Sequence, residues 1–535
     1  MSRKNNIFKQ VPVTAPKRNL FDLSHEVKTS MKFGKLYPVL LLDCIPGDVI
    51  DEQATAMVRF APMLSPVYHR VNVTTHFFFV PNRLVMDRWE RFITGGQDGQ
   101  ADDVAPPYVT VDGIGAANAS LMREGSLWDY MGLPLLPNPA PSPLNSSEWI
   151  SALPFRAYAK VYNDYYRDPN LDPELDLDTE VEGNVSTVTR TKGLLELRER
   201  GWDKDYFTAA LPWAQRGAEV LMPLAGEGSV TYKPISDVFL YDGEAPDASG
   251  SLRADIGDPQ LYLGSGIPGR VENIDQVTFG NSEITLNTLR TSLAIQRWLE
   301  ANARGGGRYI EQIQSHFGVR VPDYRLQRSE YLGGGVQPVV ISEVLATAEG
   351  EDVPVGDLAG HGISVGKSNR FHYRCQEHGF VIGIMSIMPV PSYDLGIERM
   401  WSRTSKYQFA WPEFAHIGEQ EIVSKEIFFS FDEDDHEDNM SLFGYIPRYS
   451  EYKFKNDRFT GAFRSSLAFW HLGRIFNNRP VLNSAFLRMQ ENTADEETYR
   501  RIFAVQDGTD YLWVQIFHRI RALRPLPYFG VPQIM

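Results

Sequence analysis

The chain has 535 residues, of which 43% are hydrophobic and 12% aromatic, and it carries a formal net charge of −15. The hydrophobic content suffices for a substantial core, and the acidic balance excludes a protein whose whole surface binds nucleic acid. Domain statistics suggest three or four domains at this length. No Gly/Ser tract, long proline-rich spacer or long charge block separates such domains, so we predict one large domain with long insertions between its strands.

Residues 1–20 differ from the acidic average. They contain five basic and no acidic side chains and show little hydrophobic periodicity, which predicts an extended arm. Such an arm fits contact with the phosphates of single-stranded nucleic acid, and it equally fits a tie between neighbouring subunits. Its basic residues are Arg3, Lys4, Lys9, Lys17 and Arg18.

The beginning of the chain lacks the apolar segment of a secretion signal, and no apolar run approaches the 18 residues of a membrane span. Two cysteines, Cys44 and Cys375, are too few to staple a chain of this size. We therefore expect a protein made in the cytosol, without membrane insertion, whose cysteines are reduced core thiols.

The clearest pattern of the first half is a period of two from Val71 to Phe79, rich in β-branched and aromatic residues, which predicts a long strand. Before it, the apolar run from Leu36 to Leu42 is broken by a proline and predicts an edge or entry strand. After it, we predict a short helix from Leu84 to Phe92, ended by Gly95 and Gly96, and a longer helix from Trp149 to Asp164.

Residues 217–283 are rich in Gly, Asp, Ser and Pro and contain only short strand-like pieces. A region of this kind inside a domain is typical of a functional insertion. Leucines at spacings of three and four then predict a helix from Thr285 to Arg304, and the same stripe predicts a second helix from Tyr309 to Phe317.

The last third is dominated by strands. Phe380 to Met388 is apolar on both faces, which predicts a buried central strand, and Gln420–Phe431 and Asp510–Leu523 are further strands. In the last of these, Leu512, Val514, Ile516 and Ile520 share one face. Strands at both ends of the chain with helices in the connections favour a Greek-key β-sandwich with long loops.

Two glycine-rich segments resemble nucleotide-binding motifs only superficially. The segment from Gly362 to Ser368 has His361 where a phosphate loop needs its first glycine, and it leads into a strand from Phe371 to Arg374. The segment from Gly264 to Gly269 matches the dinucleotide pattern, but neither a buried strand precedes it nor a helix follows it. We interpret both as structural.

Metal sites are not predicted either. His69 and His76, seven residues apart, would point to opposite faces of one strand. His372 and His378 would lie about 20 Å apart on an extended strand. The acidic run 432–438 lacks the glycine and ligand spacing of an EF-hand and is typical of a solvated loop.

Neither a Gly-x-Ser-x-Gly elbow nor a local Cys–His signature is present, so we predict no catalytic residue, no cofactor and no enzyme activity. A catalytic pair of carboxylates for glycoside hydrolysis remains an alternative, because the two residues of such a pair can be distant in sequence. The alternative function is therefore a secreted β-sandwich enzyme or binding protein for glycans. The missing secretion signal counts against it.

Several long stretches together resemble the major capsid protein of the gokushovirus branch of microviruses, which are small icosahedral single-stranded DNA phages. They span most of the chain, although 217–283 contains none of them. The stretches are FDLSHEVKTSMKFGKLYPV, RFAPMLSPVYHRVNVTTHFFFVPNRL with WERFITGG, LAIQRWLEANARGGGRYIEQIQSHFGV, EHGFVIGIMSIMPVPSY and FGYIPRYSEYKFKNDRFTGAFR.

The resemblance implies an eight-stranded jelly roll over residues 21–535 and assembly in the bacterial cytoplasm into a T=1 shell around circular single-stranded DNA. It also implies a protrusion at each three-fold axis, for which 217–283 is the candidate, facing a host receptor. Minor virion proteins, one DNA-binding and one acting as pilot, would share the particle. We expect the basic arm, with Arg519, Arg521 and Arg524, to face the DNA.

Overall fold

The computed structural model describes residues 17–96, 103–139, 147–215, 286–305, 327–345, 358–431, 436–489, 499–504 and 510–529, together with short strands between 231 and 278. By its internal contacts the chain divides into two compact units. One comprises Met1–Ala214 with Val319–Met535, and the other is Gln215–Gly318. Among the described residues, no helix has the length and apolar character needed to cross a membrane.

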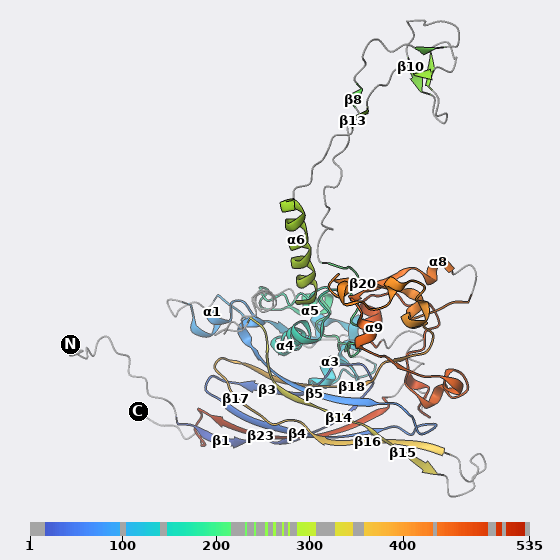
Figure 1. The fold of residues 1–535 in the computed structure, drawn as a ribbon. Helices are drawn as coiled ribbons and strands as arrows, with labels where there is room; N and C mark the ends of the chain where they lie inside the picture. The colour runs from blue at the N-terminus through green and yellow to red at the C-terminus, as the bar shows by residue number, and fades with distance from the viewer. Residues whose placement is uncertain are drawn as a thin grey trace, which may run out of the picture. The chain divides into compact units, whose positions relative to one another are not determined.

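The first unit is built on two antiparallel sheets (Figure 1). The seven-stranded sheet has the order β1 (Asn19–Asp22), β23 (Leu512–Arg524), β4 (Val49–Phe60), β16 (Leu358–Lys367) and β15 (Val340–Leu345); β2 (His25–Met31) also pairs with β23, and β17 (Phe371–Arg374) also pairs with β4. The four-stranded sheet has the order β14 (Glu330–Pro338), β5 (Val71–Pro81), β18 (Gly379–Pro389) and β3 (Tyr37–Cys44).

The two sheets bury their facing sides in one hydrophobic core. Val58 and Ile516 of the seven-stranded sheet belong to the same buried cluster as Phe77 and Val381 of the four-stranded sheet. Three sequence predictions are confirmed here. The strand from Val71 extends to Pro81, the apolar run near Phe380 is a central strand between β5 and β3, and the run after Leu36 is an edge strand.

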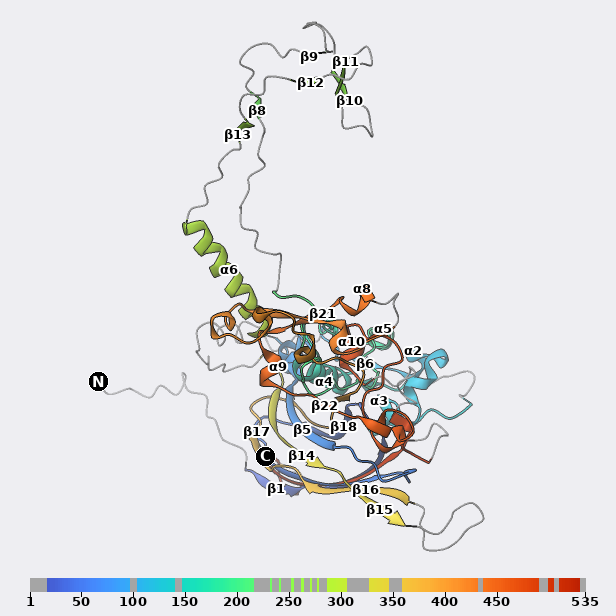
Figure 2. The same cartoon turned by 45° about the vertical axis from the view of Figure 1, so that its right-hand side comes forward.

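The opposite face of the four-stranded sheet is covered. Phe78 and Ile382, which point away from the main core, pack in a second cluster with Phe155 and Tyr158 of α4 (Leu153–Val161) and with Trp128 of α3 (Leu127–Tyr130). Figures 1 and 2 show this layer of helices and loops on the four-stranded sheet, whereas no described element covers the outer face of the seven-stranded sheet.

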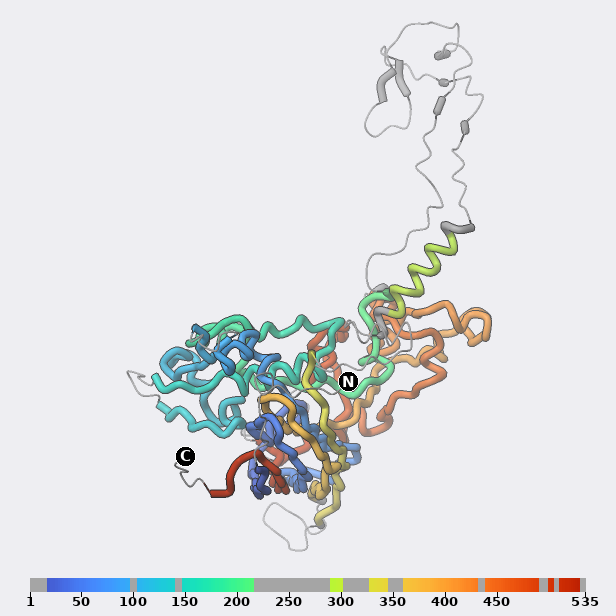
Figure 3. The backbone as a smooth tube through the Cα atoms, turned by 90° about the vertical axis from the view of Figure 1, so that its left-hand side faces the viewer, coloured from blue at the N-terminus to red at the C-terminus, as the bar shows by residue number. Residues whose placement is uncertain are grey.

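The first two strands and the last strand of the first unit pair in the seven-stranded sheet. β1 pairs with the end of β23, from Asn19 opposite Arg524 to Asp22 opposite Arg521, and β2 pairs with the beginning of the same strand. Figure 3 shows the dark blue and red segments lying together. Of the predicted arm 1–20, Lys17 and Arg18 lead directly into the sheet, and Asn19 and Leu20 already belong to β1, so the arm ends two residues earlier than predicted.

Predicted helix boundaries were less accurate. The segment predicted as a helix from Leu84 to Phe92 forms the 3-10 turn η2 (Asn82–Leu84) and then α1 (Trp89–Thr94), which ends at Gly95 with a left-handed φ of 72°, as the Gly-Gly pair predicts. The helix predicted from Trp149 begins only at Leu153, because Ile150–Ser151 forms β7 against β6 (Tyr108–Val109). A π-turn, η4 (Tyr162–Tyr166), continues α4.

Shorter elements complete the first unit. The strand predicted over Gln420–Phe431 is only half correct, since β20 (Glu419–Val423) pairs with β21 (Leu442–Pro447) and is followed by the 3-10 turn η8 (Ser424–Glu426). The other short elements include α2 (Val111–Ile114), η3 (Ala116–Met122), α5 (Ser186–Thr191), β19 (Ser392–Tyr393), η5 (Arg399–Ser402), η6 (Lys406–Gln408), α8 (His436–Asn439), α9 (Ser450–Lys453), β22 (Asp457–Arg458) and α10 (Ser484–Leu487).

The second unit contains α6 (Leu286–Gly305), which confirms the helix predicted from Thr285 to Arg304 to within one residue at each end. Its short strands form three nested antiparallel pairs, as in the arms of one long hairpin. The pairs are β8 (Thr231–Tyr232) with β13 (Val277–Thr278), β9 (Leu240–Tyr241) with β12 (Arg270–Val271), and β10 (Leu252–Ala254) with β11 (Leu261–Leu263). The predicted helix 309–317 and the glycine-rich segment 264–269 lie outside the described residues.

Candidate functional site

The outer face of the seven-stranded sheet is set by the alternation of β23. Its inward side chains, from Leu512 to Ala522, are buried without exception, and the sequence prediction for Leu512, Val514, Ile516 and Ile520 is confirmed. The alternate side chains are exposed because nothing described packs on them. They are Trp513, Gln515, Phe517, Arg519 and Arg521.

Neighbouring strands add side chains to this face. On β4, Arg59 lies opposite Trp513 and Gln53 lies opposite Arg519, while on β2 Lys28 lies opposite Gln515. On β16, Lys367 lies opposite Thr55 of β4. We call this surface the open face and define it by Lys28, Gln53, Thr55, Arg59, Val365, Lys367, Trp513, Gln515, Phe517, Arg519 and Arg521.

Asp22 of β1 and Asp51 of β4 both lie opposite Arg521 of the open face. Asp51, opposite Arg521, accepts two hydrogen bonds from Arg370, which lower the pKa of the Asp51 carboxyl. Neither Arg519 nor Arg521 forms an ion pair within the part of the chain that the structure describes. Both arginines line a hollow of about 130 Å³ together with Gln53, Asp51 and Arg370. The open face is therefore locally cationic on an acidic protein.

The sequence-predicted basic residues are only partly brought together. Lys17 and Arg18 are exposed immediately before β1, and Arg519 and Arg521 lie on the open face. Arg524 differs, because its Nε lies 3.3 Å from the buried Asp48 carboxylate and it also donates to the Asp43 carbonyl. Burial raises the pKa of Asp48 despite this partner. Arg3, Lys4 and Lys9 lie outside the described residues.

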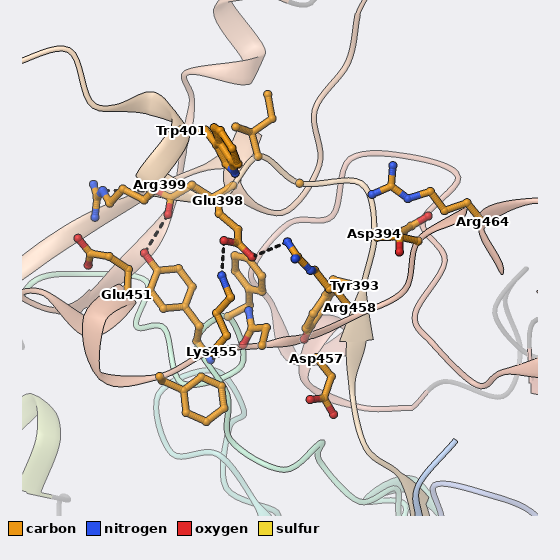
Figure 4. Close-up of a pocket in the computed structure, with 18 residues that line it drawn as sticks. Tyr393, Asp394, Glu398, Arg399, Trp401, Glu451, Lys455, Asp457, Arg458 and Arg464 are labelled. Atoms are coloured by element: carbon orange, nitrogen blue, oxygen red, sulfur yellow. Dashed lines mark hydrogen bonds and ion pairs between the residues drawn. The ribbon is translucent and has the colours of Figure 1, made fainter. Parts of the chain in front are cut away.

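A pocket of about 400 Å³ lies elsewhere in the first unit, between the segments near 206, 393–401, 426 and 451–464 (Figure 4). Glu398 pairs there with Lys455 and lies 3.6 Å from Arg458. On another wall, the Tyr206 hydroxyl donates a hydrogen bond of 2.9 Å to Glu426. Burial raises the pKa values of Glu426 and of Asp394, another lining residue.

The pocket does not contain the arrangement of an acyl-transfer or metal-assisted active site. Glu398 is engaged by cations and Glu426 by a tyrosine, whereas the buried Oδ1 of Asp394 accepts no hydrogen bond within the described residues. Sequence reasoning missed this pocket, since its walls come from segments more than 200 residues apart. One signal was available, because the stretch containing Glu451 to Arg464 is among those that carry the capsid-protein resemblance.

The histidine pairs considered as metal ligands are separated by the fold. His69 precedes β5 rather than lying on it, so the expectation of one shared strand was wrong; its Nε2 lies 2.7 Å from the Val390 carbonyl. His76 contacts the Tyr166 hydroxyl at 2.9 Å. His378 lies beyond the end of β17, so it does not share a strand with His372. Among the described residues, no cluster of three potential metal ligands is found.

The other motifs have structural roles. The segment from Gly362 to Ser368 forms most of β16 and cannot wrap a phosphate. Cys44 and Cys375 are both buried and free, and a hydrogen bond with Cys375 together with burial raises the pKa of the Cys44 thiol. Of the acidic run, residues 432–435 lie outside the described part, and His436 begins α8.

Comparison with known proteins covers nearly the whole chain. The family described as capsid protein (F protein) matches residues 9–534. Capsid protein VP1 of Chlamydia phage 1 is 33% identical over 98% of this chain and 97% of its own length, and VP1 of Bdellovibrio phage phiMH2K is 33% identical over 99% and 98%. VP1 of Spiroplasma virus 4 is 27% identical over 96% and 95%. The chain therefore belongs to the microvirus capsid protein F family, whose members are structural components of the virion rather than enzymes.

Proposed function

We propose that this chain folds as a jelly roll and self-assembles into a T=1 icosahedral shell around a circular single-stranded DNA genome. The observation that carries the proposal is the similarity to capsid proteins over almost the full length of this chain and of each relative. The two facing antiparallel sheets supply the rigid wall that such a subunit needs, and the long loops on the four-stranded sheet supply contacts to neighbouring copies.

The genome-facing residues of the proposal are the basic arm together with Arg519, Arg521 and Arg524. Support comes from β1, which places Lys17 and Arg18 next to the end of β23. Arg524 contributes less than the other two arginines, because its charge is already paired with Asp48. Five arm charges on single-stranded phosphates correspond to a salt slope of about −3.5.

Neutralising the arm tests this assignment. Replacement of Arg3, Lys4, Lys9, Lys17 and Arg18 by glutamine should lower the fraction of DNA-filled particles, measured by the ratio of absorbance at 260 and 280 nm across a density gradient. A control with glutamine at the exposed Lys406 and Lys453, which lie far from β1 in sequence and outside both sheets, should package normally. Unchanged packaging in the arm variant would reject the assignment.

The insertion 217–283 is proposed as the protrusion that contacts the host, with a cell-surface receptor as its partner. Support comes from the compact unit Gln215–Gly318, whose nested strand pairs begin and end within this range. Deletion of residues 218–282 should leave shells that assemble but adsorb poorly to host cells. If the deletion abolishes assembly instead, the region is part of the scaffold. The minor DNA-binding and pilot proteins are further proposed partners.

A further inference from the structure

The open face carries two exposed aromatic side chains that the capsid role alone does not explain. Trp513 is 50% exposed and Phe517 is 47% exposed, although both lie on β23 in the interior of a sheet. Neither ring packs against another aromatic ring of the described residues. An apolar ring on the uncovered side of a central strand loses hydrophobic free energy unless something else covers it.

The surroundings of these rings are cationic. Arg519 and Arg521 follow Phe517 at alternate positions of the same strand, and Arg59 lies opposite Trp513. Three acids lie among these residues, which are Asp22 and Asp51 opposite Arg521 and Glu26 opposite Phe517. Asp51 is paired with Arg370, and the five basic side chains of the open face outnumber the other two acids. On a chain with a net charge of −15, this combination selects an anionic partner that also offers flat apolar surfaces.

We infer that the open face is a stacking platform for single-stranded DNA, in which Trp513 and Phe517 stack on bases while Arg519, Arg521 and Arg59 bind phosphates. This inference rests on the proposed packaging of single-stranded DNA and adds the residues that contact the DNA. Aromatic rings within a positively charged surface are the arrangement by which proteins bind single strands without sequence preference. Exposed aromatic residues on a sheet face stack bases in the same way in RNA-binding domains.

The spacing along β23 supports this assignment. Trp513 and Phe517 are four residues apart and point to the same side, which separates the rings by about 13 Å along the strand. Arg519 and Arg521 follow at steps of about 6.6 Å, and both residues line the same hollow. A duplex would not satisfy this surface, because its base faces are stacked on one another and closed to aromatic side chains.

The first experiment measures binding of the full-length chain to a fluorescent oligothymidine by anisotropy at several salt concentrations. The double variant Trp513→Leu and Phe517→Leu should bind at least about fivefold more weakly at every salt concentration with an unchanged salt slope. The double variant Arg519→Gln and Arg521→Gln should reduce the magnitude of the slope by about 1.4. Trp513→Phe with Phe517→Tyr should retain affinity, because both replacements keep an aromatic face.

A matched control is Tyr407→Leu in η6, an exposed aromatic residue outside the sheet, which should bind like the unaltered chain. Thermal unfolding of every variant verifies that the fold is retained. If the leucine variant at 513 and 517 folds and binds oligothymidine with undiminished affinity, the inference is wrong.

The second experiment separates this inference from the proposed function. Ultraviolet irradiation of intact particles, followed by mass spectrometry, should locate DNA crosslinks at Trp513 and Phe517. Particles that contain DNA but show no crosslink on β23 overturn the platform and leave the capsid function intact. Particles without DNA overturn the packaging proposal itself. A protein–protein crosslink at Trp513 would show that another polypeptide covers the open face, which also overturns the platform.

Discussion

Glu52 and His518 form a fully buried pair between the two sheets. The Glu52 Oε1 lies 3.0 Å from His518 Nδ1, and His518 Nε2 lies 3.0 Å from the Val39 carbonyl. A carbonyl only accepts, so Nε2 carries a hydrogen, and the contact at Nδ1 requires one further proton between imidazole and carboxyl. Burial raises the pKa of Glu52, which favours retention of that proton.

Removing one partner of this pair should be costly. His518→Ala leaves the Glu52 carboxyl and the Val39 carbonyl buried without a partner, and we expect a loss of about 3–5 kcal/mol in the free energy of unfolding. Glu52→Gln keeps a donor for Nδ1 and should cost about 1 kcal/mol. Chemical denaturation of the unassembled chain measures both values. Equal losses in the two variants would contradict the described hydrogen bonds.

His69 and His76 predict a dependence of stability on pH. Burial lowers the pKa of each to about 4, whereas histidine in the unfolded chain titrates near 6.5. Between these values the unfolded state binds more protons than the folded state, so stability increases as pH rises from 4 to 6.5 and is lost on acidification. The loss should be about 1–3 kcal/mol for each histidine.

Replacement of both histidines by glutamine keeps polar side chains that do not titrate. The melting temperature of this variant should change less between pH 6.5 and 4 than that of the unaltered chain. Parallel pH profiles of the two proteins would show that other groups determine the acid sensitivity.

At the scale of the element, one face of β23 packs in the hydrophobic core and the other belongs to the open face, which is proposed to bind single-stranded DNA. Val514 is 4% exposed in the main core, whereas the adjacent Gln515 points to the open face. Val514→Lys buries an ammonium group without a counter-ion and should prevent folding or cost more than about 4 kcal/mol. Gln515→Lys should change stability by less than about 1 kcal/mol. Soluble yield and thermal melts compare the two; similar losses would contradict the described register.

Strands with a clear hydrophobic pattern were predictable from the sequence, because alternating apolar and polar side chains indicate which face is buried. This holds for β5 and β23, whereas β18 was predictable because its run is apolar on both faces. The failures occurred where a distant segment decided the outcome. Ile150–Ser151 is a strand because Tyr108–Val109 lies beside it. The strand after Val423 stops because the Glu426 side chain accepts from the Val423 amide at 3.2 Å and from buried Tyr206.

At the scale of the whole molecule, a capsid subunit must bury thousands of Å² against its neighbours, as permanent assemblies do. The purified chain should therefore elute as a large particle in size-exclusion chromatography and appear as symmetric shells in negative stain. High salt should release DNA from such particles more readily than it dissociates the shell, because phosphate contacts are screened and buried apolar contacts are not. A stable lone monomer that turns over a small molecule would contradict the proposed function.

The sequence by itself determined the mainly β class, the principal strands and the family. The reason is that hydrophobic patterns and long stretches shared with a family can be recognised without knowing which segments contact one another. Only the tertiary structure decided which sheet face stays uncovered, that Arg524 is paired with Asp48 while Arg519 and Arg521 remain available, and that Trp513 and Phe517 stand beside them. The physical reason is that alternation tells which side chains share a face. Whether that face is buried or free depends on segments hundreds of residues away.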